Sequence, residues 1–312
     1  MQVPLAAQRS SHDLWSVAAF AGLLICAATF TSGAAANELT REVDGLTTTA
    51  WLESAGDDAP LVFMLHGTLG HARMETLAGI QTALAERGLS SLSINLSYGI
   101  DGRSGIFECD APVTHGLAQH FVEIDAWRDW ARDEGFDIVG WFGHSRGGNQ
   151  IARWAFERGE AAPLLLLAPS TSDFEAAGEA YDARSERSRD DWLEKANTMI
   201  AAGEGAALMG EGAFLYCDAL PFSAQAFVTY YGDDPHADTP TLLADSGSEQ
   251  PVIVWIGSMD EVVADLPERL AAKKADGAAQ NLTSITIDGA DHFFRDFFAE
   301  DVADSAVDFL VR

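Results

Sequence analysis

Positive charge is scarce in this 312-residue chain, which has only three lysines and a total of 19 lysines and arginines against 48 aspartates and glutamates. The formal net charge at pH 7 is therefore -29. Such a surface repels phosphate backbones and anionic lipids over a Debye length, which argues against nucleic acid or an anionic membrane as a partner. We interpret the charge as a solubility adaptation to salty surroundings, with a specific cationic partner as the alternative.

Cofactor motifs are also lacking. The chain has no phosphate loop and no dinucleotide fingerprint, and it shows neither internal repeats nor a low-complexity linker. One short stretch, Asp234-Pro235-His236-Ala237-Asp238, has metal-ligand residue types, but its proline and its acidic context also describe a loop of a lid, which is the interpretation that we favour. We therefore expect no metal and no cofactor.

The first 36 residues have the pattern of an export signal. Arg9 precedes an apolar run over residues 14–30, and Ala34-Ala35-Ala36 offers the small residues that a signal peptidase accepts. No Arg-Arg pair precedes the run, so the general secretion route is favoured. The sequence thus predicts an exported protein, periplasmic or extracellular, without stable membrane insertion once the signal is removed.

Two alternatives for this segment stay open. Cys26 could accept a lipid, although Ile25 stands where lipoproteins usually have a small residue. The apolar run could also remain as an anchor, although its length is marginal for crossing a bilayer.

In the remainder of the chain, short apolar runs alternate with helical patterns, which predicts an α/β fold with a mainly parallel central sheet flanked by helices. Hydrophobic residues make up 47% of the chain, enough for a large core. Strands are expected over residues 47–52, 60–65, 89–96, 137–142, 163–167, 251–256 and 282–287, and helices over 72–87, 115–134 and from Ser145 to residue 157.

This order breaks between the strands at 163–167 and 251–256. Residues 171–250 have no clear strand and contain helix-like pieces at 174–183, 190–202 and 223–231. A long insertion between adjacent strands usually has a function. We therefore expect a helical cap over residues 171–250, inserted into a core formed by residues 37–170 and 251–312.

The strongest chemical signal is Gly143-His144-Ser145-Arg146-Gly147, which follows the 137–142 strand and precedes a helix. That context is what a nucleophile elbow requires, because the serine occupies a tight strand-to-helix turn in which neighbouring positions must be small. Gly143 and Gly147 supply the room. A serine at this point favours acyl transfer to water.

With these residues the chain resembles the α/β-hydrolase fold family, in particular its capped serine esterase and lipase-like branch. The resemblance covers most of the chain after the signal and implies the order nucleophile, acid, histidine. It implies His292, in Gly289-Ala290-Asp291-His292 after the last strand, as the base. It also implies Asp260, just past the 251–256 strand, as the carboxylate that orients this base. Glu261 and Asp173 are the alternatives for the acid.

The resemblance also implies an oxyanion hole. The 60–65 strand runs into His66-Gly67-Thr68, and the implied donors are the backbone N–H groups of Thr68 and Arg146. His66 and Gly67 are then structural residues that support the turn. The side chain of Arg146, where many relatives have an apolar residue, could bind an anionic substrate group or have a structural role.

These residues together predict an exported serine hydrolase that cleaves a carboxylic ester of a small-molecule acyl substrate. Thioester and amide hydrolysis would use the same groups, and a binding protein without turnover is the alternative of another class. The cap's aromatic residues could wall the substrate pocket or form the cap's own core; they are Phe214, Tyr216, Phe222, Phe227, Tyr230 and Tyr231.

The chain has three cysteines, and signal cleavage after Ala36 would remove Cys26. The remaining even pair, Cys109 and Cys217, favours a disulfide in an oxidising compartment. Cys109 lies in a loop over residues 99–114 and Cys217 in the cap, so the bond would tie the cap to the core. Two independently buried thiols are the alternative.

Overall fold

The structure, a computed structural model, describes residues 35–278 and 280–311. The predicted signal lies outside these residues apart from Ala35 and Ala36, which begin the first strand. An eight-stranded sheet has the order β1-β2-β4-β3-β5-β6-β9-β10. Its strands are β1 (Ala35–Val43), β2 (Leu46–Ser54), β3 (Leu61–Leu65), β4 (Ser90–Ile94), β5 (Ile138–His144), β6 (Leu164–Leu167), β9 (Val252–Gly257) and β10 (Leu282–Ile287).

From β4 to β10 all neighbours are parallel, while β2 pairs antiparallel with both β1 and β4. Every residue of β3 and β6 is buried, as expected for strands that are covered on both faces. The mainly parallel α/β fold that the sequence predicts is confirmed.

Strand β1 was not among the predicted strands. It joins β2 through a two-residue turn in which Asp44 and Gly45 have φ angles of 49° and 80°. Two positive φ angles are what a tight hairpin of this twist requires, and Asp-Gly is a strong signal for it. The turn was therefore visible in the sequence, but the polar residues around it hid the strand.

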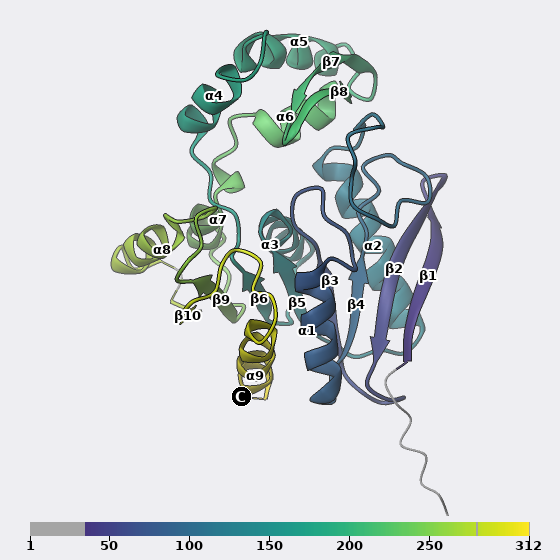
Figure 1. Cartoon of the computed structure of the whole chain (residues 1–312), viewed down its shortest axis with the longest axis vertical. Coiled ribbons are helices and arrows are strands. Elements are labelled where there is room, and N and C mark those ends of the chain that lie inside the picture. Colours follow the sequence, from purple (N-terminus) through teal and green to yellow (C-terminus); the bar gives the residue numbers. More distant parts are fainter. Residues whose placement is uncertain (1–34, 279, 312) are drawn as a thin grey trace, which may run out of the picture. The chain divides into compact units, whose positions relative to one another are not determined.

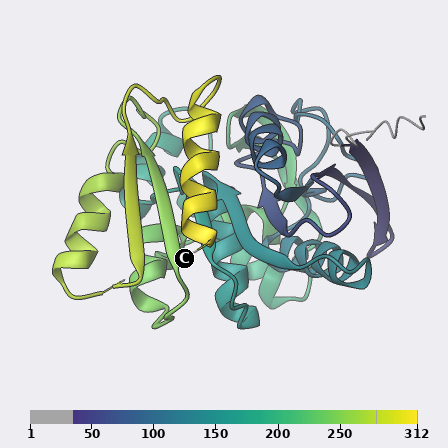
Figure 2. The same cartoon turned by 90° about the horizontal axis from the view of Figure 1, so that it is seen from below.

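Helices cover both faces of the sheet (Figures 1 and 2). Helices α1 (Glu75–Glu86) and α9 (Phe298–Leu310) pack together on one face, and α2 (Leu117–Asp133) and α3 (Arg146–Arg158) lie on the other. Helix α8 (Leu266–Ala275) follows β9. None of the helices in the described ranges has the length and apolar character needed to cross a membrane.

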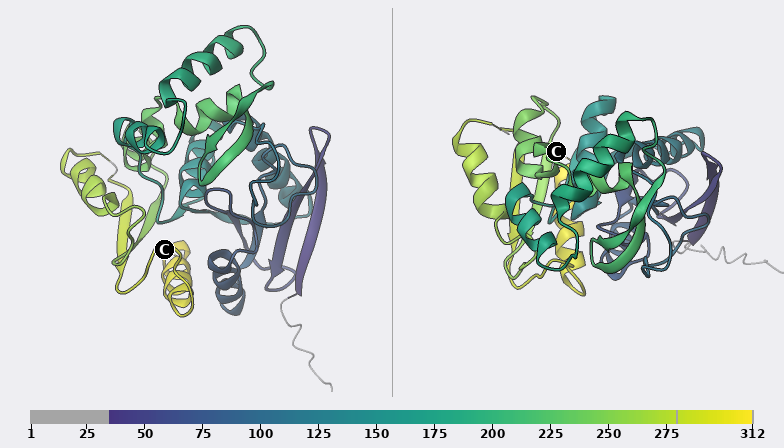
Figure 3. Two further views of the ribbon diagram at one scale, coloured as in Figure 1. Left: turned by 45° about the horizontal axis from the view of Figure 1, so that its top comes forward. Right: turned by 90° about the horizontal axis from the view of Figure 1, so that it is seen from above.

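The cap lies over the carboxyl ends of the strands (Figures 1 and 3). It consists of α4 (Phe174–Asp182), α5 (Arg189–Ala201), β7 (Leu208–Phe214), β8 (Cys217–Ser223) and α6 (Ala224–Tyr231). The cap is mainly helical, but the expectation that residues 171–250 lack a strand is wrong, because β7 and β8 form an antiparallel hairpin. After a 3-10 turn at Pro235–Ala237, α7 (Thr239–Asp245) falls in the predicted cap range but packs against α3 and α8 of the core.

Most of the cap's aromatic residues form its own core. Phe214, Phe222 and Phe227 are fully buried and stack on one another with ring centroids 5.0 to 5.3 Å apart. Tyr230 packs edge-on against Phe214 at 5.2 Å. Of the six aromatic residues that could have walled a substrate pocket, only Tyr216 lines the pocket that contains Ser145.

The predicted disulfide is confirmed. Cys109 and Cys217 are bonded, with their Cα atoms 5.7 Å apart. Next to the bond, the loop over residues 99–114 pairs with β8: the Val113 N–H donates to Pro221 O at 3.0 Å, and the Ser223 N–H donates to Val113 O at 3.0 Å. Covalent and backbone bonds therefore join the cap to this loop of the core.

Candidate active site

Ser145 lies at the turn between β5 and α3. Its φ and ψ angles are 53° and -126°, a conformation that residues other than glycine rarely adopt. A Cβ atom on Gly143 would come within 2.4 Å of Gly147 O, and one on Gly147 would come within 2.2 Å of His66 O. Glycine is therefore required at both positions, as the sequence analysis predicted for a nucleophile elbow.

His292 lies in the loop after β10, with its Nδ1 atom 2.8 Å from Asp260 Oδ2. The other oxygen of Asp260 accepts the N–H groups of Val262 at 2.8 Å and Val263 at 3.1 Å. Burial raises the pKa of Asp260, but the hydrogen bonds from His292 and these amides outweigh burial and hold the pKa below its usual range. An ionised carboxylate only accepts, so Nδ1 carries the proton and Nε2 is left as an acceptor.

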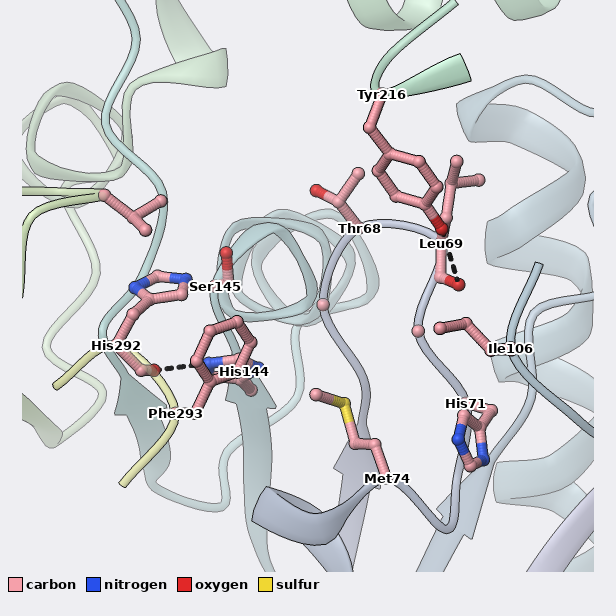
Figure 4. Close-up of a pocket in the computed structure, with 13 residues that line it drawn as sticks. Thr68, Leu69, His71, Met74, Ile106, His144, Ser145, Tyr216, His292 and Phe293 are labelled. Atoms are coloured by element: carbon pink, nitrogen blue, oxygen red, sulfur yellow. Dashed lines mark hydrogen bonds between the residues drawn. The ribbon is translucent and has the colours of Figure 1, made fainter. Parts of the chain in front are cut away.

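The side chains of Ser145 and His292 face the same pocket, and Figure 4 shows the imidazole beside the serine hydroxyl. No hydrogen bond joins the two side chains in this part of the structure. In serine hydrolases the hydrogen bond between serine and histidine often forms only in the complex with substrate.

The structure keeps the alternative acids away from this pair. Asp173 accepts the Ala176 N–H at 3.0 Å and so caps α4. Glu261 is exposed. Of the three carboxylates that the sequence analysis considered, Asp260 is the one bonded to His292.

The turn after β3 lies across the pocket from Ser145, and Figure 4 shows Thr68 on that side. A Cβ atom on Gly67 would lie 3.1 Å from Ser145 Cβ, so the turn approaches Ser145 closely. Among the described residues, the backbone N–H groups of Thr68 and Arg146 have no hydrogen-bond partner. Both donors are thus available to a ligand.

His66 supports this turn. Its Nδ1–H donates to Gly67 O at 2.7 Å and its Nε2 accepts the Leu96 N–H at 3.1 Å. Burial, together with the nearby guanidinium of Arg103, lowers the pKa of His66 well below its usual range. Both ring nitrogens are occupied, so His66 is unsuited to act as a base.

His144 has a structural role that the sequence did not reveal. This fully buried residue donates its Nε2–H to the backbone carbonyl of His292 at 2.9 Å and therefore holds the loop that carries His292. Burial and the neighbouring His292 lower the pKa of His144 to about 4. The sequence places His144 between Gly143 and Ser145, but its hydrogen-bond partner, the carbonyl of His292, is 148 residues away and is brought near only by the fold.

The pocket has a volume of about 420 Å³ and is largely apolar away from the serine. Its apolar lining residues include Leu69, Met74, Ile106, Tyr216, Val262 and Phe293.

The Arg146 side chain does not line this pocket. Its guanidinium stacks on the Tyr230 ring at 4.7 Å and has no acidic partner in the described chain. The hypothesis that it binds an anionic substrate group stays a prediction.

In the stretch from Asp234 to Asp238, the two aspartates accept hydrogen bonds from backbone N–H groups. Asp234 accepts the His236 N–H at 3.0 Å, and Asp238 accepts the Thr241 N–H at 3.0 Å at the start of α7. Throughout residues 35–278 and 280–311, no group of three or more histidine, cysteine, aspartate or glutamate side chains is arranged to hold a metal.

Comparison with known protein families and with curated proteins finds no match to the sequence. Solved structures do match. Est1E from Butyrivibrio proteoclasticus has a TM-score of 0.59 at 18% identity, over 88% of this chain and 99% of its own. The esterase domain of a Rhodothermus marinus protein has a TM-score of 0.56 at 16% identity, over 88% and 99%. The thioesterase domain from the curacin biosynthetic pathway has a TM-score of 0.53 at 15% identity, over 89% and 100%.

At these identities the similarity concerns the fold. The order of the strands, the elbow after β5 and the structural matches together show that the chain has the α/β-hydrolase fold.

Proposed function

We propose that this protein is a serine hydrolase that cleaves carboxylic esters through an acyl-enzyme on Ser145. One observation carries the proposal. A serine in a strained elbow shares a pocket with His292, whose Nδ1 atom is hydrogen-bonded to the buried carboxylate of Asp260. The similarity of the fold to esterases and to a thioesterase supports it.

In this proposal His292 Nε2 takes the proton of Ser145 as the serine oxygen attacks the ester carbonyl. Asp260 stabilises the imidazolium that forms. The N–H groups of Thr68 and Arg146 hold the negative oxygen of the tetrahedral intermediate, and each such donor is typically worth about 3 kcal/mol. The intermediate collapses to the acyl-enzyme, and His292 gives its proton to the departing alcohol. Water, deprotonated by His292, then attacks the acyl-enzyme in the same way, and the carboxylic acid leaves as Ser145 regains its proton.

The pocket favours an uncharged ester with one apolar group. Ile106, Tyr216, Val262 and Phe293 line it and remain 40 to 64% exposed, so their apolar surface is open to a ligand. The net charge of -29 disfavours anionic substrates over a long range. Thioesters and amides would meet the same groups.

Export is part of the proposal. The Cys109–Cys217 bond is compatible with an oxidising compartment, and the apolar run over residues 14–30 would supply the signal. The cleaved form would lose Ala35 and Ala36 from β1, which pair at that strand's end with Ser54 and Glu53.

A panel of p-nitrophenyl esters of increasing acyl length, with matched thioester and amide substrates, tests the activity. We expect ester hydrolysis that depends on acyl length, and a loss of roughly 10⁴-fold or more in Ser145→Ala. Near-native turnover by a purified Ser145→Ala protein would reject the nucleophile. A folded wild-type protein that is inert to every substrate would favour the binding protein.

A further inference from the structure

Arg103 is an arginine of the core without an acidic partner. Its side chain is 7% exposed, and within the described residues no carboxylate forms an ion pair with it. Its guanidinium donates instead to backbone carbonyls, to Leu96 O at 2.7 Å, to Leu69 O at 3.3 Å and to Gly70 O. An interior cation without a carboxylate partner is costly unless hydrogen bonds compensate for it. These three carbonyls supply the hydrogen bonds that hold Arg103 in place.

Two of the three carbonyls belong to the turn that begins at His66. Leu69 has a φ angle of 50°, which a leucine rarely adopts without external support. Arg103 holds the Leu69 carbonyl, and the hydroxyl of Tyr98 accepts the Leu69 N–H at 3.1 Å. The guanidinium in turn stacks on the Tyr98 ring at 4.7 Å. The stacked pair therefore bonds both peptide groups of Leu69, and Leu69 O also accepts the Phe107 N–H at 3.3 Å.

We infer that Arg103, together with Tyr98, is a positioning residue that holds the turn so that the Thr68 N–H faces the oxyanion. The inference rests on the proposed function. The Thr68 amide is one peptide group before the Leu69 N–H that Tyr98 binds, so a shift of the Leu69 backbone moves the donor directly. Displacement of a catalytic group by about 1 Å can cost about 10²-fold in rate.

The cap touches the same turn. The hydroxyl of Tyr216 lies 3.5 Å from Leu69 O and 3.3 Å from Phe107 O, and Figure 4 shows it close to Leu69. Phe107 belongs to the loop over residues 99–114, which also contains Arg103. This loop therefore bonds the turn through Arg103 and contacts Tyr216 of the cap through Phe107.

The first test compares Arg103→Met and Arg103→Lys with Arg73→Met. Arg73 also stacks on an aromatic ring, 4.5 Å from Trp51, but it pairs with Glu53 and bonds none of the turn's carbonyls. We expect kcat to fall about 10²-fold in Arg103→Met with KM within about threefold. Arg103→Lys should recover part of the loss, and Arg73→Met should match the wild type.

A trifluoromethyl ketone, which forms a tetrahedral oxyanion adduct with the serine, separates positioning from general damage. Its inhibition constant should rise by the same factor as kcat/KM falls. Hydrogen exchange of peptide 66–72, which does not contain the control position, gives a readout that does not need activity. Its amides should exchange faster in Arg103→Met and in Tyr98→Phe than in Arg73→Met. Should Arg103→Met fail to fold, Arg103→Lys and Tyr98→Phe carry both measurements.

Wild-type kcat in folded Arg103→Lys and Tyr98→Phe, with unchanged exchange in peptide 66–72, would overturn the positioning role while the proposed function stands. A wild type that hydrolyses no ester and does not react with the ketone would overturn the proposed function, and with it the catalytic part of this inference.

Discussion

Ser145 is held in a backbone conformation that is unfavourable for every residue except glycine, and backbone hydrogen bonds to neighbouring elements fix this conformation. Its N–H donates to Leu167 O at 2.9 Å, which ties the elbow to β6. Its carbonyl accepts the N–H groups of Gly148 at 2.9 Å and Ser170 at 3.1 Å. Strain of this kind costs about 1–3 kcal/mol and persists where the surroundings fix the geometry.

Asp260→Asn tests the assignment of the acid. The amide would keep the shape of the side chain but lose the charge that orients His292 and stabilises its imidazolium, so we expect kcat to fall by about 10²–10⁴-fold with an intact fold. Steady-state kinetics on the best ester would measure the loss. Glu261→Gln is the matched control and should retain activity; the reverse pattern would move the acid to Glu261.

How far these residues could be predicted depends on whether their contacts are local. Ser145 follows β5 directly and His292 lies in the loop after β10, and the carboxyl ends of parallel strands meet at one edge of the sheet. Asp260 could not be separated from Asp173 in this way, because both follow strands. Arg103 was missed because its partners lie up to 34 residues away, and only the fold brings them together.

Among the segments of the chain, the β7–β8 hairpin was the least predictable. Gly210 and Gly212 interrupt β7, and glycine weakens a strand pattern. Both glycines face the Trp192 ring, where an added Cβ would lie 3.1 to 3.2 Å from it, so the packing that explains them is tertiary. Strands β3, β6 and β9 were predictable because burial on both faces gives them continuous apolar runs.

Removing the disulfide should weaken the fold. Cys109 and Cys217 are 108 residues apart, and closing a loop of about this length stabilises by ~4–5 kcal/mol in the chain-entropy model. We expect Cys109→Ser/Cys217→Ser to lose free energy of unfolding of this order in urea denaturation. Reductant should weaken the wild type similarly and leave the double variant unchanged. Equal stability of the double variant and the oxidised wild type would contradict the role of the bond.

The chain as a unit combines a strongly acidic surface with buried neutral histidines. His120 accepts a hydrogen bond from Gln150 at 2.9 Å through Nδ1. Burial, with additional repulsion from His115, Arg146 and Arg103, lowers the pKa of His120 to about 3. The fold therefore keeps this histidine uncharged at pH values where the unfolded chain would protonate it.

Stability should consequently fall as the pH drops below about 6.5, the unfolded pKa of histidine. Above that pH His120 is unprotonated in both the folded and the unfolded state, whereas below it the unfolded chain binds one more proton. Each pH unit below it therefore lowers the free energy of unfolding by about 1.4 kcal/mol. Urea unfolding between pH 7 and 5 would measure the slope. His120→Asn keeps an acceptor for Gln150. In this variant the free energy of unfolding should depend less steeply on pH, by the contribution of about one proton. An unchanged slope would contradict the prediction.

The central claim is that Ser145 is a nucleophile activated by His292. Its most direct measurement is the reaction of the folded protein with a fluorophosphonate probe, followed by intact mass and peptide mapping. We predict one adduct per chain, located on Ser145, absent in Ser145→Ala and formed far more slowly in His292→Ala. A folded wild-type protein without an adduct, or one labelled at another serine, would contradict the account.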